Sequence, residues 1–221
     1  MNEVVVASHQ PDLFPHTGFW YKLAKSDVFD LAIHDQFQLE GYQRRVKMRG
    51  HWASLRLHEK KTYCPITDLI VHEEAGDRLW NMIRGRYEGS KYWSARQLEV
   101  RGWVEKAFIF DHLWMVNTSL IQSTAEWLGL DSMLSPSVSP QELQGAARVA
   151  ERVQRLGGSV YLSGSGARAY MTEEDPEFVS RGIRIEWSKH RHTTGDSILT
   201  SIFDDKDPME TVLLENVAVR A

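Results

Sequence analysis

The 221-residue sequence contains a single cysteine, Cys64, so no disulfide bond can form within the chain. Small secreted domains that depend on disulfide bonds are thereby excluded, and we expect a reducing, cytoplasmic location. No basic leader precedes the short apolar run at residues 4–7, which is too brief for a signal peptide. No stretch approaches the roughly 20 apolar residues of a membrane-spanning helix, so we expect no membrane partner.

Acidic residues outnumber basic ones. Lys and Arg number 26 against 30 Asp and Glu, which gives a net charge of −4. A general nucleic-acid-binding surface needs an excess of positive charge, so we expect no nucleic-acid partner. The one basic cluster, Arg44, Arg45, Lys47 and Arg49, could neutralise one anionic ligand but could not cover a duplex.

Hydrophobic residues, in contrast, are abundant. They make up 42% of the chain and include 8 Trp, 7 Tyr and 8 Phe. Aromatic side chains bury large areas, so a packed core can form without disulfide bonds. The length predicts a single domain over residues 1–221, with a helical sub-lobe over residues 75–130.

Apolar patterns predict an α/β fold. Short apolar runs predict strands over residues 4–8, 28–33, 66–71, 160–162 and 183–187, and alternation predicts a hairpin within residues 37–57. Helical spacing predicts helices over residues 19–24, 77–87, part of 94–110, 113–128, 140–157, 168–171 and 208–219. Ser139 to Glu142 form a capping box that opens the fifth of these. We expect a mixed, partly parallel sheet flanked by helices, with a central helical segment.

Two clusters of residues that could bind a ligand or take part in catalysis directly follow predicted strands. His9 and Gln10 follow the strand at 4–8, and the run Ser163-Gly164-Ser165-Gly166 follows the strand at 160–162. In parallel sheets, ligands bind outside the carboxyl ends of the strands. If both strands are central and parallel, both clusters open into one cleft.

Each cluster has a functional and a structural interpretation. A neutral His9 could act as a general base, or it could simply bond a backbone carbonyl at the end of a strand. Gln10 could orient a carbonyl or an amine, or it could cap the following turn. The glycines of the second cluster allow close approach of a ligand to the backbone, although short Gly/Ser turns are common without one.

Other candidates are weaker. Strand alternation places Arg45 and Lys47 on one face, where they could hold a phosphate or carboxylate or could line a solvated edge. His190 and His192 near Asp196, and His34 beside Asp35, do not make a convincing set of metal ligands, so no metal site is predicted. Nothing near Cys64 would lower its pKa, so a nucleophilic role is not expected.

An ordered set of motifs runs through most of the chain. It consists of Ser8-His9-Gln10-Pro11-Asp12-Leu13-Phe14-Pro15, Lys22-Leu23-Ala24-Lys25-Ser26-Asp27-Val28-Phe29, Gln36-Phe37, Tyr42-Gln43 with Arg45 and Lys47, Ala125 to Leu130, Val160 to Gly164 with Tyr170, and Ser197-Ile198-Leu199. This set resembles the WbqC-like protein family. Two departures are evident. Ile33 and His34 stand where family members usually carry paired acidic residues, and Asp35 follows one place later. The Tyr42 to Lys47 segment is also about two residues shorter than is usual in the family.

The resemblance implies a role in the biosynthesis of surface polysaccharides or specialised metabolites. It implies an acyl or aminoacyl transfer that forms an amide on the amine of a small molecule such as an amino sugar. We expect His9 and Gln10 as catalytic residues. The expected substrate-binding residues are Gln36, Arg45, Lys47, Tyr161, Ser163, Gly164, Ser165 and Tyr170.

We expect no bound cofactor, and expect instead a thioester or nucleotide-linked co-substrate, a small-molecule substrate and, for some donors, a carrier protein as partner. Two alternatives remain open. A hydrolase or cyclase could use the same groups on an activated carbonyl. A non-catalytic binding protein could use aromatic residues as an interface, with candidates at Trp20, Tyr21, Trp80, Tyr92 and Trp93.

Overall fold

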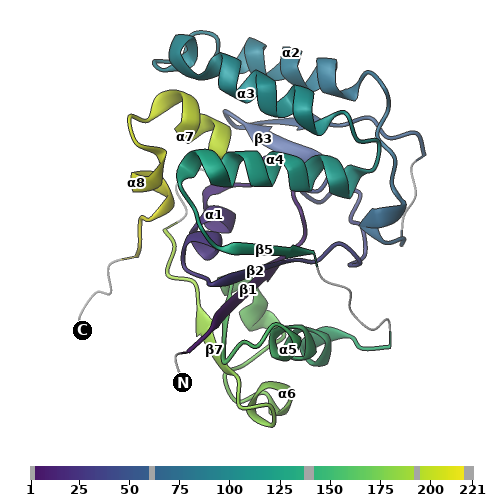
Figure 1. The fold of residues 1–221 in the computed structure, drawn as a ribbon, viewed down its shortest axis with the longest axis vertical. Helices are drawn as coiled ribbons and strands as arrows, with labels where there is room; N and C mark the ends of the chain where they lie inside the picture. Colours follow the sequence, from purple (N-terminus) through teal and green to yellow (C-terminus); the bar gives the residue numbers. More distant parts are fainter. Residues whose placement is uncertain (1–2, 60–62, 137–141, 192–194, 217–221) are drawn as a thin grey trace.

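A five-stranded parallel sheet forms the centre of the computed structural model, which describes residues 3–59, 63–136, 142–191 and 195–216. The strand order is β5 (Met133–Pro136), β2 (Val28–Leu31), β1 (Val5–His9), β6 (Val160–Ser163) and β7 (Arg184–Trp187) (Figure 1). All four neighbouring pairs are parallel. The predicted α/β class is confirmed.

Helices cover both faces of this sheet, which explains why its central strands are apolar on both sides. Ala7, Phe29 and Leu162 belong to the core shared with α1 (Thr17–Ala24) and α4 (Leu113–Leu128). Val6 and Val28 belong to a second core, under α5 (Gly145–Arg155) and α6 (Pro176–Val179). In Figure 1 the α5–α6 layer lies below the sheet and the α1–α4 layer lies above it.

The central helical segment comprises α2 (Ala75–Tyr87), α3 (Trp93–Ala107) and α4. Its buried residues join the same apolar cluster as the upper face of the sheet. Near the C-terminus, α7 (Ile198–Asp204) and α8 (Pro208–Val212) complete this layer, and the Phe203 ring packs on Tyr87 and Trp93 with ring centroids 5.1 and 5.0 Å apart. Among the described residues, no helix has the length and apolar character needed to cross a membrane.

The predicted hairpin is present as β3 (Arg45–Met48) and β4 (His51–Ser54). Arg49 and Gly50 form its two-residue turn with φ of 49° and 77°. Positive φ at both turn positions matches the right-handed twist of the two strands.

Several sequence predictions were wrong. Residues 66–71 form no strand, because Ile66, Leu69 and Val71 are buried at uneven spacing; the short 3-10 helix η1 (Ile66–Asp68) occupies the first half. The helix expected at 168–171 is instead the 3-10 helix η2 (Ser165–Ala169). The last helix ends at Val212, not 219. β5, α6 and α7 were not predicted, because each is too short to show a period.

The helix α5 begins at Gly145 and not at the predicted capping box. Residues 139–141 of that box lie outside the described part of the chain, so its capping contacts stay a prediction.

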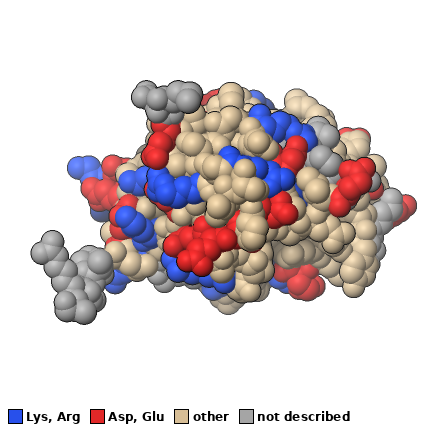
Figure 2. All heavy atoms as spheres, turned by 90° about the horizontal axis from the view of Figure 1, so that it is seen from below, with Lys and Arg blue, Asp and Glu red and all other residues tan. Residues whose placement is uncertain are grey.

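Charged side chains are interspersed on the face of the molecule that carries α5 and α6. Figure 2 views that face, and Lys and Arg alternate there with Asp and Glu. Basic residues form no continuous band on this face within the described residues, which agrees with the low positive charge of the sequence.

Candidate functional site

The two strand-end clusters meet in one pocket. The chain passes from β1 through α1 to β2 on one side and later returns to β6 on the other side of β1, so the order of the sheet reverses between β1 and β6. Ligands of open α/β sheets bind at such a reversal, outside the carboxyl ends of the strands. A cavity of about 320 Å³ lies at this point, and residues of both clusters line it.

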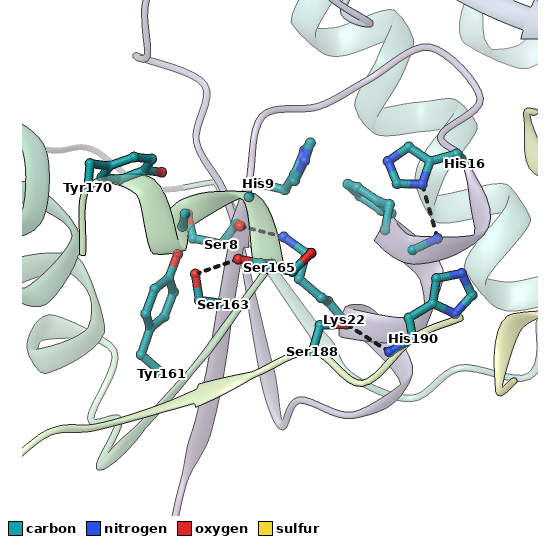
Figure 3. Close-up of a pocket in the computed structure, with 15 residues that line it drawn as sticks. Ser8, His9, His16, Lys22, Tyr161, Ser163, Ser165, Tyr170, Ser188 and His190 are labelled. Atoms are coloured by element: carbon teal, nitrogen blue, oxygen red, sulfur yellow. Dashed lines mark hydrogen bonds between the residues drawn. The ribbon is translucent and has the colours of Figure 1, made fainter. Parts of the chain in front are cut away.

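The lining is mainly polar. In Figure 3, Ser8, Ser163, Ser165 and Lys22 converge at the centre of the pocket. The rings of His16 and His190 lie on one side, and Tyr161 and Tyr170 lie on the other. The volume falls at the small end of the range for small-molecule sites, about 300–1,000 Å³.

His9 projects from the end of β1 with one ring nitrogen engaged. Its Nδ1 lies 3.0 Å from the carbonyl oxygen of Gln10 and 3.5 Å from a carboxylate oxygen of Asp12. Because a carbonyl can only accept, we assign the proton to Nδ1, which leaves Nε2 as the acceptor of the neutral ring. Burial, the Lys22 ammonium and His16 hold the pKa of His9 well below 6.5, so the ring is neutral near pH 7. About a third of the side chain, 32%, remains exposed.

Lys22 is a pocket residue that sequence reasoning missed. It is 6% exposed, and its Nζ donates to the carbonyl oxygen of Ser8 at 3.0 Å. Burial lowers its pKa to about 8, while Asp12 opposes that shift. Asp12 is itself buried, and burial raises its pKa to about 7 against the effect of Lys22. The available signal was a lysine in the middle of a helix whose other positions are apolar or small.

Beneath the pocket, a buried charge network joins the sheet to α5. The hydroxyl of Ser8 donates to Asp30 at 2.5 Å, across the β1–β2 register. The guanidinium of Arg152 lies 3.9 Å from Asp30 and makes two hydrogen bonds to Asp35, which Arg148 also contacts at 2.9 Å. Asp35 is therefore paired with α5 and does not line the pocket.

The second cluster contributes a buried hydroxyl surface. Ser163 is 1% exposed, and Tyr161 stacks on Phe178 with ring centroids 5.7 Å apart. Burial raises the pKa of Tyr161 above its usual 10, so its phenol stays neutral across the physiological range. Gly164 and Ser165 begin the turn into η2, and Tyr170 at the rim is 67% exposed.

Four of the predicted site residues lie outside the pocket lining: Gln10, Gln36, Arg45 and Lys47. The amide of Gln10 donates to the carbonyl oxygen of Gln36 at 3.0 Å and accepts from Gln43, so it joins two loops. Arg45 pairs with Glu40 and lies over the Trp52 ring at 4.5 Å. Lys47 faces Trp52 across the hairpin. Their assignment to substrate binding stays a prediction.

The loop between β1 and α1 is held by side chains from two helices, α4 and α1. The amide of Asn117 on α4 donates to the carbonyl oxygens of Pro11 and Gln43, both at 2.7 Å. The indole of Trp20 donates to Pro15 at 3.0 Å. Phe14, buried within the loop, has φ of 41°, a conformation that non-glycine residues rarely adopt. The loop therefore presents His9 from a rigid support.

The weaker sequence candidates form no reactive centre in the described residues. His190 is buried and its Nε2 lies 2.9 Å from the Thr17 hydroxyl, while His192 lies outside the described residues. Asp196 accepts a hydrogen bond from the Gly50 amide. Within the described ranges, no group of three or more His, Cys, Asp or Glu side chains could hold a metal ion.

Comparison with known proteins connects this site to a family. No curated protein and no solved structure matches the chain. The model of the WbqC-like protein family matches residues 10–195. This match begins one residue after His9 and includes Lys22, the Ser163–Gly166 turn and His190. Because it covers well over half of the 221 residues, the chain belongs to the WbqC-like protein family.

Proposed function

We propose that the protein is a biosynthetic transferase that forms an amide by acyl or aminoacyl transfer to an amine of a small polar molecule. The observation that carries the proposal is the neutral His9, whose Nε2 is available at a pocket between β1 and β6. A general base must be unprotonated at the working pH, and the neutral His9 meets this condition.

The pocket favours a polar acceptor over a long hydrocarbon chain. Hydroxyl groups of Ser8, Ser163, Ser165 and Ser188 line it, together with the phenol of Tyr161. Hydroxyls both donate and accept hydrogen bonds, so they complement a ligand that carries several hydroxyls of its own. An amino sugar has this chemistry, with the amine that amide formation requires.

The proposed step is direct. The acceptor amine attacks the carbonyl carbon of an activated donor and forms the C–N bond. His9 Nε2 takes the proton that the amine loses, and the C–S bond of a thioester, or the C–O bond of a nucleotide-linked donor, breaks with departure of its leaving group. The leaving group takes a proton in turn, which His9 can return. No covalent enzyme intermediate is needed.

Most of the aromatic residues considered for a binding interface are buried. Trp20, Tyr21 and Trp93 are 0%, 4% and 7% exposed and belong to the core, whereas Trp80 and Tyr92 are half-buried. A hydrolase or cyclase would use the same His9 on water or on an internal nucleophile, and it differs from the transferase only in what attacks the carbonyl.

The experiment is mass-spectrometric analysis of a panel of acyl and aminoacyl thioesters and nucleotide-linked donors, each incubated with and without amino-sugar acceptors. An amide product that requires the acceptor supports the transferase. Free acid or a cyclised product formed without acceptor would replace it with the hydrolase or cyclase alternative. Tight acceptor binding with no product from any donor would favour a binding protein.

A further inference from the structure

Lys22 has hydrogen-bonding capacity that the fold does not use. An ammonium group carries three N–H donors. In the described part of the structure the Lys22 Nζ has one hydrogen-bond acceptor, the carbonyl oxygen of Ser8, and lies 5.9 Å from the centre of the Phe29 ring. The side chain is more than nine-tenths buried, so water does not freely satisfy the remaining donors.

The same amine lines the pocket. Among the described residues that form the lining, Lys22 is the single Lys or Arg. Figure 3 shows its nitrogen directed to the centre of the pocket, whose lining also includes Ser163 and Ser165. A buried cation with unused donors is stabilised by an anion that reaches it, because both charge and hydrogen bonds are then satisfied.

We propose that Lys22 is an anion subsite for a ligand oxygen, either a carboxylate oxygen or a carbonyl oxygen that gains negative charge during reaction. The ligand oxygen accepts from the Lys22 Nζ in a pocket that Ser163 and Ser165 also line. This site does not require amide transfer. If the proposed function holds, the ligand oxygen is that of the attacked carbonyl, and Lys22 contributes to the carbonyl orientation for which Gln10 was one candidate.

The charge on Lys22 sets how the site depends on pH. The titratable groups around it are His9 at the end of β1, Asp12 and His16 in the loop between β1 and α1, and Tyr161 and His190 across the pocket. His9 and Tyr161 stay neutral near pH 7. Anion binding therefore follows protonated Lys22 and weakens as pH rises through about 8. Ionised Asp12 competes for the cation, which weakens binding further above about pH 7.

The test is an NMR titration of the full chain with acetate as the probe, at a pH one to two units below and above the Lys22 pKa of about 8. We expect wild-type affinity to fall by about tenfold or more between the two conditions, and Lys22→Met to lose about tenfold at the lower pH. The matched control is Lys25→Met, on the next turn of the chain and paired with Glu215 outside the pocket. It should stay within about twofold of wild type.

Three outcomes would overturn the subsite: wild-type binding that is absent or independent of pH, Lys22→Met binding equal to wild type, or an equal loss in Lys25→Met. A second measurement covers a variant that fails to fold. Acetate should raise the pKa of Lys22 in the wild-type protein, observed by NMR of its side-chain resonances, and an unchanged pKa contradicts the proposal. Because neither readout uses turnover, failure of the transferase proposal would leave this result standing, and the reverse also holds.

Discussion

Individual residues at the pocket hold charge states that burial determines. Burial raises the pKa of Asp12 to about 7 and lowers that of Lys22 to about 8, so two oppositely charged groups both move toward neutrality. Burial of these two ionisable groups is unfavourable, and both of them lie at or next to the pocket. Perturbed ionisable groups inside a cleft are typical of functional sites.

The cost of burying Lys22 leads to a prediction about stability. The unfolded chain binds a proton at Lys22 up to about pH 10.5 and the folded chain only up to about 8, so wild-type stability rises with pH across that window. Replacement by methionine removes the penalty. We expect Lys22→Met to raise the free energy of unfolding by about 2 kcal/mol at neutral pH, after loss of the bond to Ser8, and by little near pH 10.5. Urea unfolding at both pH values measures this, and a less stable variant at neutral pH would contradict it.

At the residue level, the sequence identified part of the pocket lining. His9, Tyr161, Ser163, Gly164, Ser165 and Tyr170 all line the pocket. They could be found because they follow apolar strands or lie close behind one in sequence. Lys22 and Asp12 could not be found in this way, since their importance comes from burial, which a local pattern does not report. Asn117 was missed for the same reason: it reaches the loop from a distant helix.

Among the structural elements, α5 is attached to the sheet by charge as well as by apolar packing. Arg152 is 3% exposed and contacts both Asp30 and Asp35. Loss of one partner in a buried ion pair leaves the other charge without compensation. The network also holds the carboxylate that accepts from Ser8 at the floor of the pocket.

We therefore expect Arg152→Met to lower the free energy of unfolding by about 3 kcal/mol. Arg155→Met on the same helix is the control, because its pair with Glu151 is partly exposed and within one helical turn. It should change stability by less than about 1 kcal/mol. Thermal and urea unfolding compare the two, and equal effects would show that the buried network is not what attaches α5.

Close packing also fixes the connection from α5 into β6. A Cβ atom at Gly158 would lie 2.5 Å from Val6 Cγ2 and 2.7 Å from Val153 Cγ1. Gly158→Ala should therefore destabilise the fold by about 1–3 kcal/mol through overpacking. Gly102→Ala in α3 has open space around its Cβ and should stabilise by about 0.5–1 kcal/mol through helix propensity. Unfolding curves with the same sign for both would contradict this packing.

Long helices and strands buried on both faces were predicted from the sequence, whereas several short elements were not. The helix Leu113–Leu128 was predicted to the residue, since it has four turns of apolar spacing and a left-handed Gly129 at its end. The central strands were predicted because both of their faces are buried. Short elements such as α6 and α7 depend on side-chain caps at Asp175 and Ser197, and such single-residue signals are easily overlooked.

For the whole molecule, the decisive feature is the order of strands in the sheet. The sequence could indicate two reactive strand ends, but not that β6 pairs with β1 while β5 pairs with β2. That order arises from contacts between residues more than 100 positions apart, which periodicity does not encode. Once β1 and β6 are neighbours, the meeting of the two clusters follows from the geometry of parallel strands.

The family departure also has a structural consequence. Ile33 is 6% exposed and lies within the main core, and the backbone carbonyl of the adjacent His34 accepts from Arg148. The position of Ile33 suits an apolar side chain in this protein. The acids nearest to it, Asp30 and Asp35, are both engaged by Arg152. This pairing supports the proposal that His9, and not a carboxylate of that segment, carries the chemistry.

The most direct test of that assignment is the rate of acceptor-dependent amide formation for wild type, His9→Ala and His51→Ala, each measured from about pH 5 to pH 9 on a donor–acceptor pair found by the panel. His51 is an exposed histidine on β4 and serves as the control. We expect His9→Ala to lose about 100-fold or more, and His51→Ala to match wild type. Since the pKa of His9 is held well below 6.5, the wild-type rate, corrected for the fraction of unprotonated acceptor amine, should show no loss as pH falls from 7 to about 6. A His9→Ala enzyme with wild-type turnover would show that the pocket between β1 and β6 performs its chemistry without this base.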